Sequence, residues 1–239
     1  LATYVNTNLL EPNKNKNWSE GLYFSLENDI PEDSVITKTI GTPDTDDEIR
    51  YIHFGGTFNG HGHRMTVNLY GEENNVGLFG YLSSTGYIDS LTIGGVVKGT
   101  SNVGGFVGYC EEGTISHCQN EATIIGNNDA GGICGYASYA NINGCNNAGM
   151  VLSTENKAGG IAGEANFTNI EGCTNIATIE ALTLSSYSGG IVGKASNKTE
   201  INYCLNAGMV IGENKIGGIV GEAASTKINE CLVACNWNS

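Results

Sequence analysis

Hydrophobic and polar positions recur along most of the chain in one order, with a period of about 28 residues. Each copy contains a glycine-rich core such as GGFVGY, in which apolar residues stand between glycines. The last glycines of six such cores, 27 to 30 residues apart, are Gly80, Gly108, Gly135, Gly163, Gly193 and Gly221. Six copies in one register indicate an internal repeat, which has to be recognised before any other assignment of fold.

Three further positions repeat after each core. Seven or eight residues after the last glycine comes an isoleucine: Ile88, Ile115, Ile142, Ile170, Ile201 or Ile228. Three residues later stands Leu91 or one of five cysteines, namely Cys118, Cys145, Cys173, Cys204 and Cys231. Two residues beyond the cysteine, four copies carry Asn120, Asn147, Asn175 and Asn206. Each repeat therefore offers three short extended segments separated by Gly, Asn and Ser, without helical periodicity.

This pattern predicts an all-β fold, a right-handed parallel β-helix or solenoid, whose coils of about 28 residues contain three strands each. A single coil cannot bury its own apolar positions. Coils stacked about 4.8 Å apart bury one continuous core and pair every strand with its equivalents above and below. Right-handedness is expected because parallel crossover connections almost always have that hand.

Residues 1–50 lack the repeat, and we expect them to form an N-terminal cap with irregular first coils that protects the edge of the solenoid. Residues 51–235 hold the repeats and 236–239 form a short tail, within one structural domain. The chain begins at Leu1 without an initiator methionine or a signal-like segment. We therefore expect a monomeric piece of a larger protein.

The five cysteines in register predict a column of inward-facing thiols. Adjacent members would lie about 4.8 Å apart, farther than the Cβ spacing of about 3.8 Å that a disulfide prefers. Free thiols acting as small apolar fillers fit better, with some disulfides, metal binding or redox chemistry as alternatives. Zinc sites gather four ligands around one point, and a line of thiols does not. Three cysteines outside the column have no partner assigned by spacing: Cys110, Cys134 and Cys235.

The four asparagines in register predict an amide ladder at a corner, in which each side chain hydrogen-bonds its neighbours along the axis. We predict no metal site, no cofactor and no catalytic set. His53, His61 and His63 are close in sequence but are assigned structural roles, with metal binding as the alternative. The acidic run from Asp44 to Glu48 lacks the spacing of a calcium loop and is expected to be solvated.

Three tyrosines follow the last glycine of successive repeats: Tyr81, Tyr109 and Tyr136. In register they would form an outward aromatic stripe, which either braces the wall or binds a ligand, because aromatic side chains anchor many interfaces. We take this tyrosine stripe as the candidate binding surface.

The charge of the chain limits the classes of partner that we expect. There are 11 basic and 25 acidic residues, for a formal net charge of −14. Such a surface repels the phosphates that a nucleic-acid-binding protein must neutralise, and it also repels anionic membranes. The sequence contains no stretch of roughly 18 consecutive apolar residues, so we predict no insertion into a membrane.

The block GTFNGHGHRM at 56–65, followed by VGLFGYL and by the cores VGGFVG and AGGIAG, resembles the GLUG-motif proteins of bacterial cell surfaces. Segments 1–6 and 26–30 resemble the openings of such proteins, so the resemblance covers nearly the whole chain. It implies a β-helical extracellular module, found in adhesin-like proteins and as an accessory region of large surface enzymes, including IgA-protease-type metallopeptidases. It implies no conserved catalytic set. Asn59, where an aspartate is common, and an extra His61 depart from the usual block.

The internal repeat, the net charge and the resemblance to GLUG-motif proteins together predict a non-catalytic structural and binding module. We expect it outside the cell or on a bacterial cell surface. Its expected partner is a glycan or a host or extracellular protein. Two alternatives stay open: a polysaccharide-degrading β-helix enzyme, because fold does not determine function, and an accessory region of a surface metallopeptidase. A lyase would place basic and acidic residues on adjacent coils of one face, whereas the basic residues are scattered along this chain.

Overall fold

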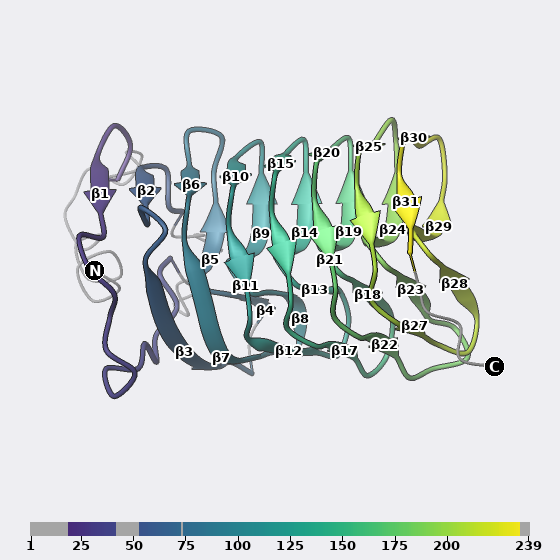
Figure 1. Ribbon diagram of the computed structural model, residues 1–239, viewed down its shortest axis with the longest axis horizontal. Coiled ribbons are helices and arrows are strands. Elements are labelled where there is room, and N and C mark those ends of the chain that lie inside the picture. The colour runs from purple at the N-terminus through teal and green to yellow at the C-terminus, as the bar shows by residue number, and fades with distance from the viewer. Residues whose placement is uncertain (1–18, 42–52, 73, 235–239) are drawn as a thin grey trace, which may run out of the picture.

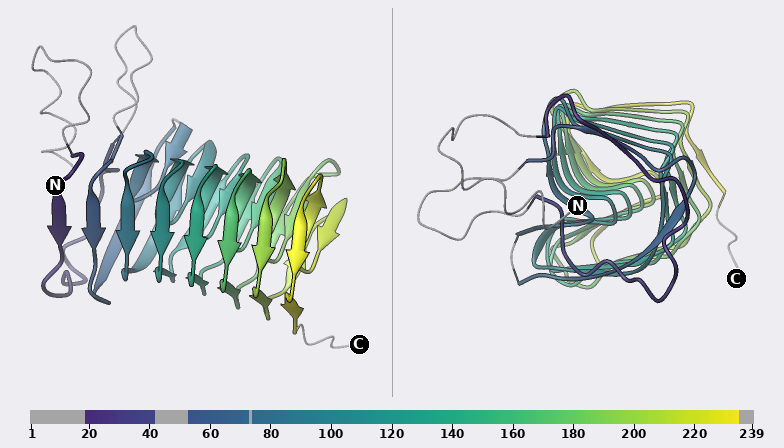
Figure 2. Two further views of the ribbon diagram at one scale, coloured as in Figure 1. Left: turned by 90° about the horizontal axis from the view of Figure 1, so that it is seen from above. Right: turned by 90° about the vertical axis from the view of Figure 1, so that its left-hand side faces the viewer.

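The computed structural model describes residues 19–41, 53–72 and 74–234. In these residues every strand pairs in parallel with its equivalent in the next coil, and there is no helix (Figure 1). Successive coils nearly superimpose in the end-on view of Figure 2. The predicted all-β parallel solenoid is therefore confirmed.

The strands form four sheets that run the length of the solenoid. The first sheet contains β1 (Tyr23–Ser25), β2 (Thr57–Asn59), β6 (Tyr87–Asp89), β10 (Thr114–Ser116), β15 (Asn141–Asn143), β20 (Asn169–Glu171), β25 (Glu200–Asn202) and β30 (Lys227–Asn229). The second contains β3 (Arg64–Tyr70), β7 (Thr92–Lys98), β11 (Gln119–Asn120), β12 (Thr123–Gly126), β16 (Asn146–Asn147), β17 (Val151–Ser153), β21 (Thr174–Asn175), β22 (Ile179–Ala181), β26 (Leu205–Asn206), β27 (Val210–Ile211) and β31 (Leu232–Val233).

The other two sheets are built from the glycine-rich cores. The third sheet contains β4 (Asn74–Val76), β8 (Ser101–Gly104), β13 (Ala130–Gly131), β18 (Lys157–Gly159), β23 (Tyr187–Gly189) and β28 (Lys215–Gly217). The fourth contains β5 (Phe79–Leu82), β9 (Val107–Glu111), β14 (Cys134–Ser138), β19 (Ala162–Asn166), β24 (Val192–Ser196) and β29 (Val220–Ala223).

Corners divide one or two of the three extended segments expected in each coil, so that a coil contains four or five short strands rather than three. The glycine-rich segment bends between the third and fourth sheets. At Gly131 an added Cβ would lie 2.0 Å from the carbonyl oxygen of Cys134, so only glycine fits this bend. The asparagine segment is continuous in β3 and β7 and is divided into two strands from β11 and β12 onward.

The core is a set of apolar columns along the axis. Ile115 pairs with Ile88 and Ile142, and all three are fully buried. Phe106 and Ile133 occupy the centre of successive glycine-rich segments and are also fully buried. Burying such a side chain contributes roughly 1.5–3 kcal/mol, so the repeated columns supply most of the driving force for folding.

The described part of the N-terminal segment, 19–41, forms an irregular first coil. Strand β1 pairs with β2, Ile36 bridges to Val67, and Ile40 bridges to Phe79. Only short stretches of this coil follow the register of the repeats. The remaining stretches leave space between the first coil and the next one.

Candidate functional site

The buried asparagines form a continuous ladder of amide hydrogen bonds. Asn120 Nδ2 donates to Asn147 Oδ1 at 2.8 Å, and Asn147 donates in turn to Asn175 at 2.8 Å. Asn175 Nδ2 donates to Asn206 Oδ1 at 2.9 Å. Within its own coil, Asn120 Oδ1 also accepts from the backbone N–H of Ala122 at 3.0 Å. The ladder therefore joins coils and holds a corner of the second sheet at the same time.

The cysteine column faces the core. Its first four members are buried, Cys231 is half-buried in the last coil, and the seven described cysteines are free thiols. Cys145 Sγ donates to the carbonyl oxygen of Asn143 at 3.4 Å. Burial raises the pKa of the Cys145 thiol well above its usual value, which leaves it protonated and unreactive.

The two described cysteines outside the column are also buried. Burial raises the pKa of Cys110 to about 12 and that of Cys134 well above its usual value. A protonated, inaccessible thiol is neither a nucleophile nor a metal ligand. Cys235 lies outside the described residues.

The tyrosine stripe lies on the outer face of the fourth sheet, on β5, β9 and β14. The rings of Tyr81 and Tyr109 have centroids 5.0 Å apart, and those of Tyr109 and Tyr136 are 5.2 Å apart and nearly parallel. The ring faces therefore contact one another. Tyr109 and Tyr136 are half-buried, and burial raises the pKa of Tyr109 to about 12.

Tyr81 is less exposed than the sequence suggests. Its side chain is buried, the ring of His53 packs edge-on with a centroid distance of 4.4 Å, and its hydroxyl donates to the Glu111 carboxylate. The stripe therefore offers a ligand ring edges and hydroxyl groups near Tyr109 and Tyr136 rather than three open ring faces.

Charged residues continue the tyrosine column in the next three coils: Glu164, Lys194 and Glu222. Lys157, from the third sheet, lies 2.6 Å from Asp129 and 2.8 Å from Glu164 through its Nζ atom. Burial alone would lower the pKa of Lys157, but the two carboxylates outweigh it and raise that pKa. This charged cluster links the outer faces of the third and fourth sheets across their glycine corner.

The histidines do not converge on a metal site. His63 Nδ1 lies 3.0 Å from Asp29 Oδ1, and His117 Nδ1 lies 3.1 Å from Asp89 Oδ1. The backbone N–H of His61 donates to Asn59 Oδ1 in a turn. Among the described residues, no group of three His, Cys, Asp or Glu side chains is placed to hold a metal ion. The acidic run Asp44–Glu48 lies outside the described residues.

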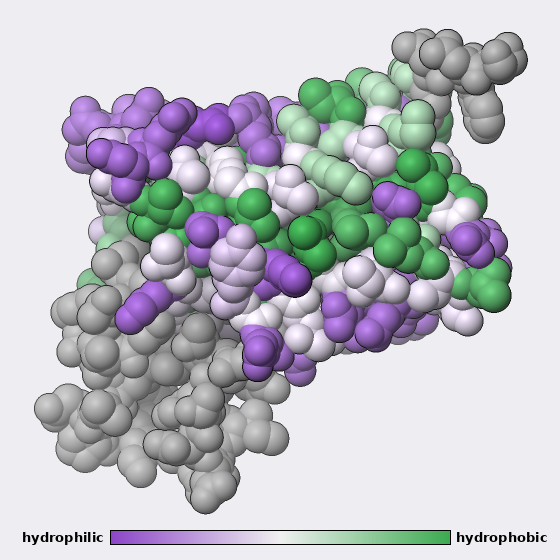
Figure 3. Space-filling model, turned by 90° about the horizontal axis from the view of Figure 1, so that it is seen from below, coloured by the Kyte–Doolittle hydropathy of each residue, from purple (hydrophilic) through white to green (hydrophobic). Residues whose placement is uncertain are grey.

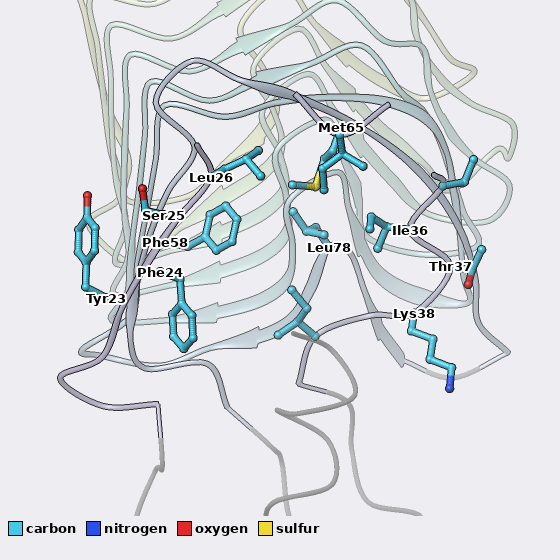
Figure 4. A pocket seen from close by; sticks show the side chains of 13 residues that line it. Tyr23, Phe24, Ser25, Leu26, Ile36, Thr37, Lys38, Phe58, Met65 and Leu78 are labelled. Carbon is cyan, nitrogen blue, oxygen red and sulfur yellow. The ribbon is translucent and has the colours of Figure 1, made fainter. Parts of the chain in front are cut away.

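A cavity of about 620 Å³, which the repeat pattern does not reveal, lies between the irregular first coil and the regular coils (Figure 4). Most of its lining is apolar, including Phe24, Leu26, Phe58, Met65 and Leu78. Its volume falls within the range of small-molecule sites. The sequence signal for it is the loss of the repeat before residue 51, which predicts imperfect packing at that end.

Two exposed surfaces were also missed. Tyr139 and Phe167 stack at the corner between the fourth and first sheets, with ring centroids 4.6 Å apart. Both stand three residues before the repeated isoleucine, so alignment of the repeats could have found the pair. In addition, hydrophobic side chains form a band across the face shown in Figure 3. The exposed residues Met150, Ile176 and Met209 lie in the segments between β16 and β17, β21 and β22, and β26 and β27.

Residues 99–125 match the family model described as the GLUG motif. The chain carries a GLUG motif. The matched residues run from β8 through most of β12, so one GLUG motif corresponds to about one turn of this solenoid. The resemblance inferred from the glycine-rich cores is thus confirmed for these residues. Comparison with curated protein sequences finds no match.

The solenoid has the same fold as a Bacteroides ovatus protein of known crystal structure, which is provisionally named an immunoglobulin A1 protease. The TM-score is 0.62 at 20% sequence identity, over 90% of this chain and 72% of that chain. At this identity the likeness establishes the fold alone. In the described part of the chain, no helix is long and apolar enough to cross a lipid bilayer.

Proposed function

We propose that this GLUG solenoid is a non-catalytic structural and binding module located outside the cell or on its surface. The observation that carries the proposal is that the repeated asparagine and cysteine side chains have structural roles. Asparagine amides bond to neighbouring coils and cysteine thiols lie in the core, so neither is available for chemistry. Ligand contact is left to residues on the outer faces.

The proposed ligand is a glycan or an extracellular protein that lies along the fourth sheet. Tyr109 and Tyr136 present ring edges and hydroxyl groups there, and Glu164 and Lys194 extend the same column with charges of both signs. A surface that combines aromatic edges with hydrogen-bonding groups suits an extended polar ligand.

The test is binding of the purified chain to a glycan array and to a panel of extracellular proteins. A Tyr109→Ala and Tyr136→Ala double variant should lose at least about tenfold in affinity, as expected for two interface aromatics. Tyr203→Ala, which removes an exposed tyrosine on another corner, is the matched control. Circular dichroism reports whether each variant keeps the fold. Absence of binding by the wild type, or equal binding by the double variant, would contradict the proposal.

A second candidate is an accessory region of a surface peptidase, which the fold shared with the Bacteroides ovatus protein supports. In that role the solenoid would position a catalytic domain or its substrate. Proteolysis of immunoglobulin A by the full-length gene product, lost when the solenoid is deleted from it, would favour this candidate. Release of oligosaccharides from polysaccharides by the isolated chain would instead favour an enzyme.

A further inference from the structure

The corner between the fourth and first sheets carries at least one residue with left-handed backbone in each of several coils. Five such residues, with φ between 49° and 60°, are Glu112, Tyr139, Phe167, Asn197 and Ser225. This corner follows the upper edge of the solenoid in Figure 1, where β9, β14 and β19 end. Left-handed backbone favours glycine or asparagine and is strained for bulky side chains. Two adjacent coils nevertheless place aromatic residues there.

These two aromatic side chains are exposed. The side chains of Tyr139 and Phe167 are 53% and 37% exposed, and their rings stack with an interplanar angle of 5°. Their exposure contrasts with the tyrosine stripe, where Tyr81 is buried. Because the pair combines backbone strain with little burial, stability accounts poorly for these residues, and strained positions of this kind are often functional.

The neighbours on the same corner determine the charge of a suitable ligand. Glu112 is exposed one coil before Tyr139, and its backbone N–H donates to the carbonyl oxygen of Ser138 at 2.8 Å. Ser138 pairs with Glu111, so the register places Glu112 beside Tyr139, in the coil opposite to that of the stacked Phe167. Lys198, exposed one coil beyond Phe167, disfavours a cation at the opposite end.

A cation at this position would gain from two effects. An aromatic ring attracts a cation placed over its face, and a nearby carboxylate adds a charge-assisted hydrogen bond. The net charge of −14 also raises the rate at which a basic partner approaches.

We propose that Glu112, Tyr139 and Phe167 form a recognition site for a basic side chain, arginine or lysine, of a partner protein. The inference rests on the proposed binding role and deepens it by naming a second surface and the chemistry of its partner. The planar guanidinium of arginine suits the site best, because it stacks on an aromatic face while donating to a carboxylate. We call these three residues the aromatic corner.

The test is a fluorescence or NMR titration of the full chain with an acetylated, amidated tetra-arginine peptide. A Tyr139→Gly and Phe167→Gly double variant should bind the peptide about threefold to tenfold more weakly, the size of one or two exposed cation–π contacts. Glycine suits the left-handed backbone, so the melting temperature should change by less than about 3 °C. Glu112→Gln should also weaken binding.

The matched control is Tyr203→Gly. Tyr203 is 58% exposed and has φ of 55°, but it lies on the other corner of the first sheet, and the described residues offer it no stacked ring. This variant should bind the peptide like the wild type.

Equal affinity of the wild type and the double variant would overturn the proposal, because it would show only general attraction to an acidic protein. Aromatic-dependent binding of a neutral oligosaccharide, without binding of the peptide, would assign the corner to glycans and overturn it as well. A large fall in the melting temperature of the double variant would identify the pair as a structural brace. If the wild type binds glycans on the array but does not bind the peptide, this inference is rejected while the proposed function stands.

Discussion

At the scale of single residues, the solenoid turns polar side chains into structural ones by stacking them. Asn147 is 1% exposed, yet its amide is satisfied because the coils above and below present the same group in register. A buried polar group without a partner costs about 1–3 kcal/mol, so the ladder stabilises the fold only while it is continuous.

Replacing Asn147 by alanine should therefore lower the free energy of unfolding by about 2 kcal/mol, because Asn120 and Asn175 each lose a buried partner. Urea denaturation followed by circular dichroism measures the change. Asn146→Ala, at the adjacent exposed position in β16, is the control and should stay within about 0.5 kcal/mol of the wild type. Equal effects of the two substitutions would show that the ladder adds nothing to stability.

A second residue-scale prediction concerns pH. A hydrogen bond from the Arg64 guanidinium lowers the pKa of Glu121 below its ordinary value of 4.5. Because the pKa is lower in the folded state, this pair stabilises the protein above pH 4.5, and the contribution is lost as the pH falls through the folded-state pKa. Both side chains are a third or more exposed, so solvent screening limits the effect to about 0.5 kcal/mol.

The stability of Glu121→Gln should accordingly fall less than that of the wild type between pH 7 and pH 3.5. Urea denaturation at the two pH values measures the difference. An identical pH dependence in the two proteins would show that the ion pair is not maintained in solution.

At the scale of strands, glycines determine how the third and fourth sheets meet. Gly135 in β14 faces the backbone of β8, and an added Cβ would lie 2.3 Å from the carbonyl carbon of Asn102. One coil further, an added Cβ on Gly163 would lie 2.6 Å from the carbonyl carbon of Asp129, and the adjacent Glu164 lies 2.8 Å from Lys157 Nζ. The glycine-rich core thus specifies a sharp corner as well as an extended segment.

Gly135→Ala should destabilise the protein by more than about 3 kcal/mol or prevent folding, because a methyl group cannot enter without separating β14 from β8. Gly172→Ala is a control in which φ is 61° and the nearest atom lies 4.0 Å from the added Cβ. There only backbone strain of about 1 kcal/mol is expected. Thermal unfolding of both variants measures the difference, and similar melting temperatures would refute the corner assignment.

At the scale of the whole molecule, stability is a sum over coils and their interfaces. Ile142, in a central coil, is fully buried, whereas Ile216 and Ile228 in the last coil are 50% and 43% exposed. Strands of that coil pair with a neighbour on one side among the described residues. The last coil should therefore open more readily than the central ones.

Hydrogen exchange followed by mass spectrometry tests this gradient. Amides of β15 and β20 should exchange more slowly than those of β30, because local opening needs less free energy where fewer apolar contacts are lost. Uniform exchange along the first sheet would show that the solenoid opens only as a whole.

The repeat alone determined the solenoid, its core columns and the asparagine and cysteine ladders, because identical coils stacked in register can place a repeated residue only above its own copy. Tertiary structure decided what depends on contacts between different positions. Tyr81 is buried because His53, which precedes the first glycine-rich core, packs against it, and the cavity exists because the first coil is irregular. The charged cluster forms because a glycine corner brings two sheets together, and Tyr139 and Phe167 are exposed because they lie at the turn between the fourth and first sheets.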